Sequence, residues 1–316
     1  MPSSRKRSLR KNRQTRNLNF EALEIRRLLT VNGPGVSDPA LFDLVIDVPA
    51  DTTSTSILAE IGEVAGETVQ LNVADGGFVE SNAEAFAGNE VNISGGEIGG
   101  NFSALSGSEV NISGGVVGNF SNAESDSKVN ISGGEVGVAF AAESGSEVNI
   151  SGGELGRGFD ANSGSVVNIS GGVVGSEFNA NSGSEVNISG GEVGLQFEAF
   201  SGSEVNISGG VVGVRFDALS GSVVNVTGGE IGAASSAQSG SVVNVSGGEI
   251  GTFFNAEPNS VVNISGGSFG VGFDAEANSN VTISGGLFGS RFAAQTDSNV
   301  ELIGGDFRLN GEIFGG

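Results

Sequence analysis

Residues 149–167 read N-I-S-G-G-E-L-G-R-G-F-D-A-N-S-G-S-V-V, and this 19-residue unit recurs along the chain without a change of spacing. Its Asn falls on ten positions, each 19 residues after the last: Asn92, Asn111, Asn130, Asn149, Asn168, Asn187, Asn206, Asn225, Asn244 and Asn263. Thr282 and Glu301 continue the series at the same step. A period near 20 residues is typical of solenoids, in which each coil packs only on its neighbours.

The order of residues within one unit predicts the path of a coil. Val148 and Ile150 flank Asn149 at a spacing of two, so in a strand they share the inward face while Asn149 faces out. The Gly pair that follows predicts a corner, because Gly tolerates positive φ angles. Phe159 and Ala161 predict a further short strand with its apolar side chains inside. Each coil is therefore expected to have three short faces and three corners.

These features predict an all-β fold, a right-handed parallel β-helix with 19 residues per coil. Crossovers between parallel strands are right-handed almost always. Left-handed triangular helices use hexapeptide periods, which do not fit a step of 19. Calcium-binding β-rolls need an Asp soon after the Gly pair, and leucine-rich repeats need several Leu per unit. Neither pattern is present in this sequence.

Stacking of the coils is expected to place like residues on like at about 4.8 Å. Nine Phe residues should then form one buried aromatic column. They are Phe102, Phe140, Phe159, Phe178, Phe197, Phe216, Phe254, Phe273 and Phe292. Ser121 and Ser235 interrupt the column, and Phe120 is displaced from it by one residue.

The period divides the 316-residue chain into four parts. Residues 1–31 form a basic segment, expected to be disordered or a short helix, and residues 32–56 form a linker with one apolar strand, Leu41 to Val48. Residues 57–90 are expected to be degenerate coils that cap the solenoid, because residues 72–77 repeat the core motif with one inserted residue. Residues 91–316 hold twelve 19-residue repeats. No apolar run is long enough for a transmembrane helix.

The charge is strongly divided between the tail and the body. Residues 1–31 hold nine of the 14 Lys and Arg and only two acids, a net charge of +7, and the remainder holds 35 acids and five bases, a net charge of −30. An acidic body repels nucleic acid and anionic membranes, so neither is expected as its partner. The basic arm alone could bind nucleic acid inside a cell, which stays an alternative.

Several residue types that carry chemistry are missing from the sequence. The chain has no Cys, His, Trp or Tyr. Disulfides and thiolate metal sites are therefore excluded, as are the commonest general base and the usual stacking platforms for sugars and bases. We expect no cofactor.

The end of the basic segment carries a motif. After the basic run, residues 20–29 read F-E-A-L-E-I-R-R-L-L. This resembles the N-terminal LEPR-x-LL sorting segment of large surface or secreted proteins of planctomycete bacteria. The matching residues are Leu23, Glu24, Arg26, Leu28 and Leu29, with Ile25 where the family has Pro. The resemblance implies export to the cell surface or beyond. In period and architecture, the coils are also similar to those of filamentous-haemagglutinin-type adhesins.

The outward side chains offer four candidate chemistries. The Asn series forms N-x-S/T sequons, but an amide ladder that bonds from coil to coil is the favoured interpretation. Two columns of Glu, one beginning at Glu90 and one at Glu97, could bind divalent cations weakly. A polysaccharide lyase or hydrolase would need a local cluster of acids or bases, whereas Arg157, Arg215 and Arg291 are dispersed. An ice-binding face would be richer in Thr.

The sequence therefore predicts a non-catalytic, adhesin-like structural solenoid, extracellular or at a bacterial cell surface, whose partners are cell-surface or matrix polymers. The alternatives are a carbohydrate-active β-helix enzyme and a weak Ca²⁺-binding surface protein. The last repeat decays after Gly305 into residues without a polar cap. An open last coil exposes strand edges, so three alternatives stay open: these residues fold over the end, the solenoid self-associates end to end, or the chain is shortened.

Overall fold

The structure is a computed structural model that describes residues 44–48, 60–61, 68–304, 308–309 and 312–313. All of them belong to one compact unit, Asp38–Gly316. The predicted sorting segment, with Leu23, Glu24, Arg26, Leu28 and Leu29, lies outside the described residues.

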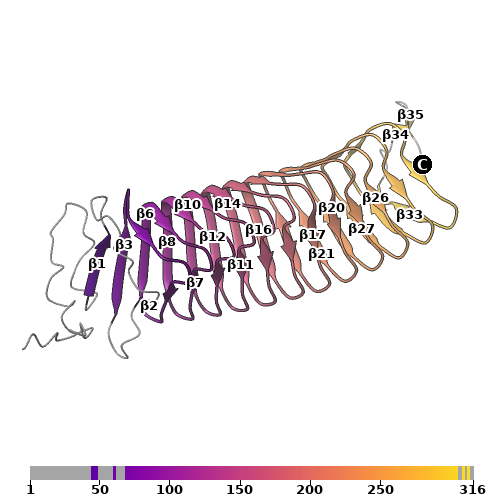
Figure 1. The fold of residues 1–316 in the computed structure, drawn as a ribbon. Helices are drawn as coiled ribbons and strands as arrows, with labels where there is room; N and C mark the ends of the chain where they lie inside the picture. The colour runs from indigo at the N-terminus through magenta and orange to yellow at the C-terminus, as the bar shows by residue number, and fades with distance from the viewer. Residues whose placement is uncertain (1–43, 49–59, 62–67, 305–307, 310–311, 314–316) are drawn as a thin grey trace, which may run out of the picture. The chain divides into compact units, whose positions relative to one another are not determined.

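Every regular element in the described part is a β-strand, and the coils stack side by side along one axis from β3 to β33 (Figure 1). The strands pair in parallel with the expected register, so that Val148 lies opposite Val129 and Asn149 opposite Asn130. The predicted all-β parallel β-helix with 19-residue coils is confirmed.

The first sheet carries the V-N-I-S motif and has 20 strands in the described part. In six successive coils, one nine-residue strand bends at the Gly pair and covers two faces: β6 (Glu90–Ile98), β8 (Glu109–Val117), β10 (Lys128–Val136), β12 (Glu147–Leu155), β14 (Val166–Val174) and β16 (Glu185–Val193). The register shifts at the bend in every pair of these strands, as it does between Ile131 and Glu135.

From Glu204 onward the same two faces are carried by separate strands. The first face holds β18 (Glu204–Ile207), β21 (Val223–Val226), β24 (Val242–Val245), β27 (Val261–Ile264), β30 (Asn280–Ile283) and β33 (Asn299–Leu302). The second holds β19 (Val211–Val212), β22 (Glu230–Ile231), β25 (Glu249–Ile250), β28 (Ser268–Phe269) and β31 (Leu287–Phe288).

The third face forms a second sheet of short strands that carries the Phe and Ala positions. Its thirteen described strands are β2 (Glu60–Ile61), β5 (Glu84–Ala85), β7 (Ser103–Ala104), β9 (Asn122–Ala123), β11 (Ala141–Ala142), β13 (Asp160–Ala161), β15 (Asn179–Ala180), β17 (Phe197–Ala199), β20 (Phe216–Ala218), β23 (Ser236–Ala237), β26 (Asn255–Ala256), β29 (Asp274–Ala275) and β32 (Ala293–Ala294). The three expected faces are all present.

The N-terminal end of the first sheet holds β1 (Leu44–Val48), β3 (Val69–Val73) and β4 (Phe78–Val79). The apolar strand expected inside the 32–56 linker is thus present as β1, and it pairs in parallel with β3 as part of the sheet. The degenerate motif at residues 72–77 keeps its register, because Asn72 pairs with Asn92. A short antiparallel pair, β34 (Arg308–Leu309) and β35 (Glu312–Ile313), follows the last coil.

The core is the interior of the coils, filled by the residues that alternate with the outward polar ones. Val148 and Ile150 are buried whereas Glu147 and Ser151 are exposed. The Val, Ile and Ala columns continue through every coil of the stack up to Ile283. Their β-branched side chains suit a pleated surface that is buried on one side.

The Phe column lies inside the stack, with one exception among its predicted members. The first eight, from Phe102 to Phe273, are at most 5% exposed, whereas Phe292, just before the last strand of the second sheet, is 36% exposed. Successive rings from Phe140 to Phe216 have centroids 4.6–5.4 Å apart. Full burial of one such side chain contributes about 1.5–3 kcal/mol, so this column is a main source of stability.

Serine fills the two gaps in the Phe column. Ser121 and Ser235 are buried, and their hydroxyls donate to the carbonyls of Gly118 and Gly232 at 2.9 and 3.0 Å. The displaced Phe120 is 62% exposed. The interruption therefore satisfies its polar groups locally and divides the rings into two stacks.

All three corners use backbone with positive φ, including the S-G-S corner, where Gly164 has φ of 80°. The second Gly of each pair has this conformation, as at Gly153 with φ of 81°. The residue just before the Phe column also has it in every coil, although the residue there is usually not Gly: Asn82, Asn101, Phe120, Ala139, Gly158, Glu177, Gln196, Arg215, Ala234, Phe253, Gly272 and Arg291. Such backbone costs a non-Gly residue about 1 kcal/mol or more, so this corner is held by the stack around it.

The third corner, at the S-G-S motif, contains a buried serine that sequence reasoning did not single out. Ser146, for example, is buried, and its hydroxyl donates to the carbonyl of Glu143 at 2.7 Å. Equivalent bonds are made by Ser108, Ser127, Ser184, Ser203, Ser222, Ser241 and Ser260. The serine hydroxyl thus supplies the hydrogen bond that water would otherwise donate to this carbonyl at the turn.

Candidate functional site

The outer surface of the first face is dominated by the predicted Asn ladder, the ten Asn from Asn92 to Asn263. The Nδ2 of each one donates to the Oδ1 of the Asn in the preceding coil, at 2.8–3.0 Å. The ladder is confirmed over its whole predicted length. It extends at its N-terminal end through Asn72 to the carboxylate of Asp47, which accepts at 2.8 Å.

All ladder amides point the same way along the stack, with N–H toward the N-terminal end. A carboxylate at the donor end of such a row is electrostatically favourable, for the same reason that acids are favoured at the N-terminus of a helix. Asp47 has this position. The Asn side chains therefore serve coil-to-coil bonding.

The Glu column, defined as Glu90, Glu109, Glu147, Glu185 and Glu204, lies beside the ladder. Each of these five carboxylates accepts a hydrogen bond from a ladder amide in its own coil or in the next one, at 2.7–3.3 Å. In the coil between Glu109 and Glu147, Lys128 occupies the column and lies 3.7 Å from the Glu147 carboxylate. The column was expected to be a simple solvated acidic face, and its bonds to the amides were missed by sequence reasoning.

The second acidic column, which includes Glu135, Glu154 and Glu192, lies beyond the Gly pair and is exposed. Adjacent members stand opposite one another, as Glu135 does to Glu154. The described residues contain no group of three or more acids arranged to hold a metal ion.

The dispersed arginines occupy the exposed corner before the Phe column. Arg157 lies 3.8 Å from the Glu177 carboxylate, and both side chains are exposed. An exposed pair of this kind contributes little to stability, about 0–1 kcal/mol.

One carboxyl group has a perturbed acidity. Partial burial raises the pKa of Glu257 above its ordinary value, and the nearby carboxylates of Glu276 and Asp217 raise it further. These acids lie beside or on the short strands of the second sheet, away from the Asn ladder.

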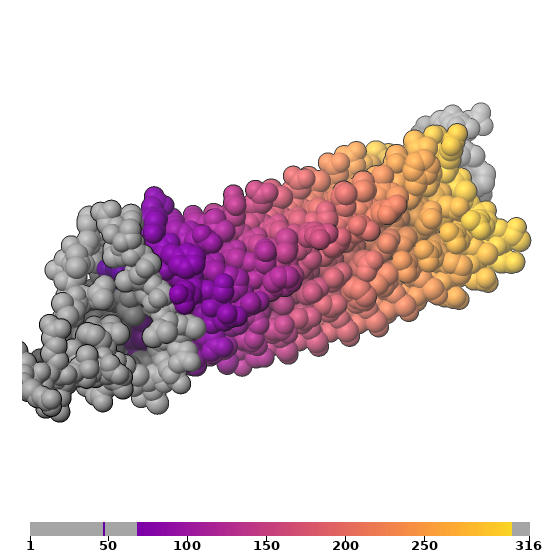
Figure 2. Space-filling model, viewed as in Figure 1, coloured from indigo at the N-terminus to yellow at the C-terminus, as the bar shows by residue number. Residues whose placement is uncertain are grey.

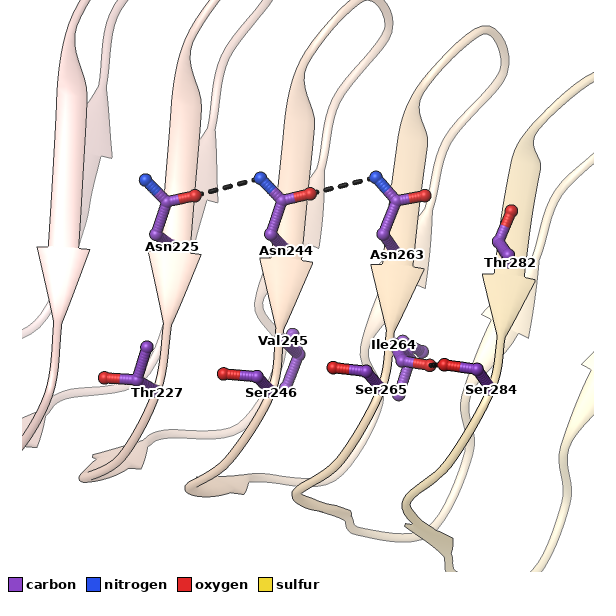
Figure 3. Close-up of a pocket in the computed structure, with 10 residues that line it drawn as sticks. All are labelled: Asn225, Thr227, Asn244, Val245, Ser246, Asn263, Ile264, Ser265, Thr282 and Ser284. Atoms are coloured by element: carbon purple, nitrogen blue, oxygen red, sulfur yellow. Dashed lines mark hydrogen bonds between the residues drawn. The ribbon is translucent and has the colours of Figure 1, made fainter. Parts of the chain in front are cut away.

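A shallow groove of about 480 Å³ runs over four coils of the first face, on β21, β24, β27 and β30 (Figure 3). One side is formed by the ladder amides of Asn225, Asn244 and Asn263, and its floor includes Val245 and Ile264. The other side is a row of hydroxyls that belongs to Thr227, Ser246, Ser265 and Ser284, with Thr282 next after the ladder amides (Figure 3).

A second, more open hollow of about 550 Å³ lies at the S-G-S corner. Four coils supply its lining: Glu143, Ser144, Asn162, Ser163, Asn181, Ser182, Phe200 and Ser201. Figure 2 shows the stacked coils as one continuous series of side-chain rows from indigo to yellow.

Comparison with known proteins gives little beyond the fold. No protein-family model matches the chain, and no curated protein matches it. Among solved structures, the chain is similar to the TibC-catalysed, hyper-glycosylated fragment of TibA. The sequence identity is 16% and the TM-score 0.46, over 83% of this chain and 97% of that one. Within the described residues no helix could span a membrane.

Proposed function

We propose that this chain is an exported, non-catalytic, adhesin-like solenoid that presents a repetitive surface of Asn, Ser and Glu to cell-surface or matrix polymers. The observation that carries this proposal is the unbroken Asn ladder with its bonded Glu column. It makes a surface amide recur in register in ten successive coils, with a Glu of the column beside it in five of them.

A surface of this kind favours contact with partners that also repeat. Once one coil holds a polymer, neighbouring coils meet its next units at high effective concentration, so weak contacts add up to firm attachment. A single-site enzyme gains nothing from such repetition, which is why structural attachment is favoured over polysaccharide cleavage.

The proposed location is the bacterial cell surface or the medium. It is supported by the resemblance of residues 20–29 to a sorting segment and by the acidic body that follows. Fractionation of the producing cells, followed by protease treatment of intact cells, tests it. We expect cleavage of the protein on intact cells or recovery from the medium, and a purely cytoplasmic pool would refute export.

The non-catalytic role has its own test. The purified chain is incubated with acidic polysaccharides, and release of reducing or unsaturated ends is followed. We expect no turnover. Turnover that a point substitution in the second acidic column abolishes would establish the enzyme instead.

Attachment is tested with the full chain on immobilised extracellular matrix from the producing organism. We expect retention that weakens steeply when the solenoid is shortened by whole coils. Retention that is independent of coil number would contradict attachment through a repeated surface.

A further inference from the structure

The groove on β21–β30 differs from the rest of the first face in its charge. Upstream, the position two residues before the ladder Asn holds Glu in five coils, Lys128 in one and Val166 in one. Along the groove the same position holds Val223, Val242, Val261 and Asn280. No ionisable residue lines the groove, in a chain of net charge −23. Glu230 and Glu249 follow the Gly corner of these coils and do not line the groove, and Glu204 and Glu301 lie in the coils just beyond its two ends.

The loss of the Glu column also changes the hydrogen bonding of the ladder. Asn225 still donates to the carboxylate of Glu204, at 3.3 Å. Asn244 and Asn263 each donate only to the preceding ladder Asn, at 2.9 Å, as Asn111, Asn168 and Asn206 also do upstream. Each of these two amides therefore keeps one N–H directed to the surface without a partner among the described residues.

The hydroxyls on the opposite side of the groove show a matching difference. In coils upstream of the groove, the serine after the inward Ile donates to a backbone carbonyl of the preceding coil at 3.3–3.4 Å, as Ser170 and Ser189 do. In the groove, Thr227 and Ser284 make the same bond at 3.4 Å, whereas Ser246 and Ser265 make none to any residue that the structure describes. The groove thus combines two amide donors without a second partner and two hydroxyls without a partner among the described residues (Figure 3), while the side chains of Val245 and Ile264 are buried in the core beneath it.

From this geometry we propose that the groove binds an uncharged polysaccharide strand lying along the solenoid axis. Amide and hydroxyl groups that recur at every coil, about 4.8 Å apart, match a polymer that presents hydroxyls at regular intervals. An anionic polymer is disfavoured by the charge of the chain.

An extended peptide fits the same groove less well. The backbone of these strands is already paired with the coils on both sides, as β24 is with β21 and β27. No strand edge is therefore open along the groove for a peptide to extend the sheet. A polymer read through side-chain amides and hydroxyls is favoured instead.

The test uses the full chain and three soluble probes: cellohexaose and mannohexaose, which are uncharged, and hexagalacturonate, which is anionic. Binding is measured by calorimetry, and by NMR through the side-chain amide signals of ¹⁵N-labelled Asn. We expect at least one uncharged hexamer to bind and to shift a subset of these signals. No binding of either uncharged hexamer, or tighter binding of hexagalacturonate, overturns the proposal.

The decisive variant restores the upstream chemistry in the groove. Val242→Glu combined with Val261→Glu places Glu at the position that Glu185 and Glu204 occupy in other coils. The fold already accommodates Glu at this position. Binding should weaken about tenfold or more, because the new carboxylates engage the free amides and lose hydration beneath the sugar. Val166→Glu makes the same change outside the groove and should leave binding within about twofold. If Val166→Glu weakens binding as much as the groove variant does, the groove is refuted as the binding site.

A second variant tests the groove independently, in case the first variant does not fold. Ser246→Ala with Ser265→Ala removes two hydroxyls that make no bond in the fold, so the unfolding midpoint should not change while binding weakens. Unchanged binding overturns the proposal. The proposed binding in the groove rests on the function proposed above, but the two can be refuted separately. If the Val242→Glu, Val261→Glu variant still attaches to matrix, the groove is refuted alone. If the native chain does not attach to matrix, the proposed function is refuted.

Discussion

The acidic stretch of the solenoid, β6 to β18, and the neutral stretch, β21 to β30, share one motif but differ in surface and strand geometry. In the acidic stretch a single strand bends through the Gly pair, up to β16. In the neutral stretch the strand ends before the pair, and the amides of Thr227 and Gly228 both reach the carbonyl of Ile207, at 2.8 and 3.4 Å. The inward residues are of the same kind in both stretches. The core therefore fixes the coil path, while the outward position two residues before the ladder Asn can change from Glu to Val.

The largest expected effect comes from the core that both stretches share. Phe197→Ala removes a fully buried ring that lies between Phe178 and Phe216, with centroids 4.6 and 5.0 Å away. It should lower the free energy of unfolding by about 3–5 kcal/mol, measured by urea denaturation. Phe292→Ala, at a site 36% exposed, should cost clearly less. Equal losses would show that the column does not act through burial.

The ladder gives the next effect and separates the two stretches. Asn187 donates to Asn168 and to Glu185, and it accepts from Asn206. Asn187→Ala should cost about 1–3 kcal/mol of unfolding free energy, since it leaves its neighbours unpaired. Asn263→Ala breaks one such bond, to Asn244, and should cost about 1 kcal/mol or less. A greater loss at Asn263 would mean that the acidic stretch gains nothing from its extra bonds.

A smaller effect, of opposite sign, is expected at the strained corner. Gln196 has φ of 60° and an exposed side chain, so Gln196→Gly should raise the unfolding free energy by about 0.5 kcal/mol. Phe253→Gly makes the same change in the neutral stretch. There the ring lies so close over Gly272 that a Cβ on that glycine would come within 2.9 Å of it. Loss of this contact should cancel the gain, and thermal denaturation of both variants checks the difference.

The smallest effect concerns Glu257, whose pKa is raised in the folded state above its ordinary value of 4.5 by burial, then by Glu276 and Asp217. A raised carboxyl pKa means that ionisation favours the unfolded chain. This penalty is absent below about pH 4 and grows as pH rises through the folded pKa. Glu257→Gln should therefore raise the unfolding midpoint at pH 7 and leave it unchanged at pH 3. A uniform shift at both values would point to a cause other than ionisation.

The coil was predictable because its signals are local and repeated. Alternation around Asn149 fixed which residues face in, and the constant step of 19 fixed which residues stack. The ladder from Asn92 to Asn263 followed from these two facts, because like amides stacked in adjacent coils lie within hydrogen-bonding reach of each other.

The features that sequence reasoning missed depend on geometry that no residue type announces. The positive-φ corner is occupied by Phe120, Glu177 and Arg215 alike, so composition gives no sign of it. The groove was also missed. Its meaning depends on which amide N–H groups lack a carboxylate, and that requires side-chain positions. The hydroxyl of Ser246 makes no hydrogen bond within the described residues, whereas the equivalent hydroxyl of Ser189 does, and this is a difference of the same kind.

The one-way direction of the Asn ladder has a consequence for how such a chain can change over generations. In the ladder, each coil accepts a hydrogen bond from the following coil and donates one to the preceding coil. An added coil therefore meets the same partners as any coil already present. In-frame duplication or deletion of whole units therefore leaves no amide unmatched inside the stack. Length can vary in steps of one repeat under little selection from folding, and the reach of the molecule becomes the heritable trait.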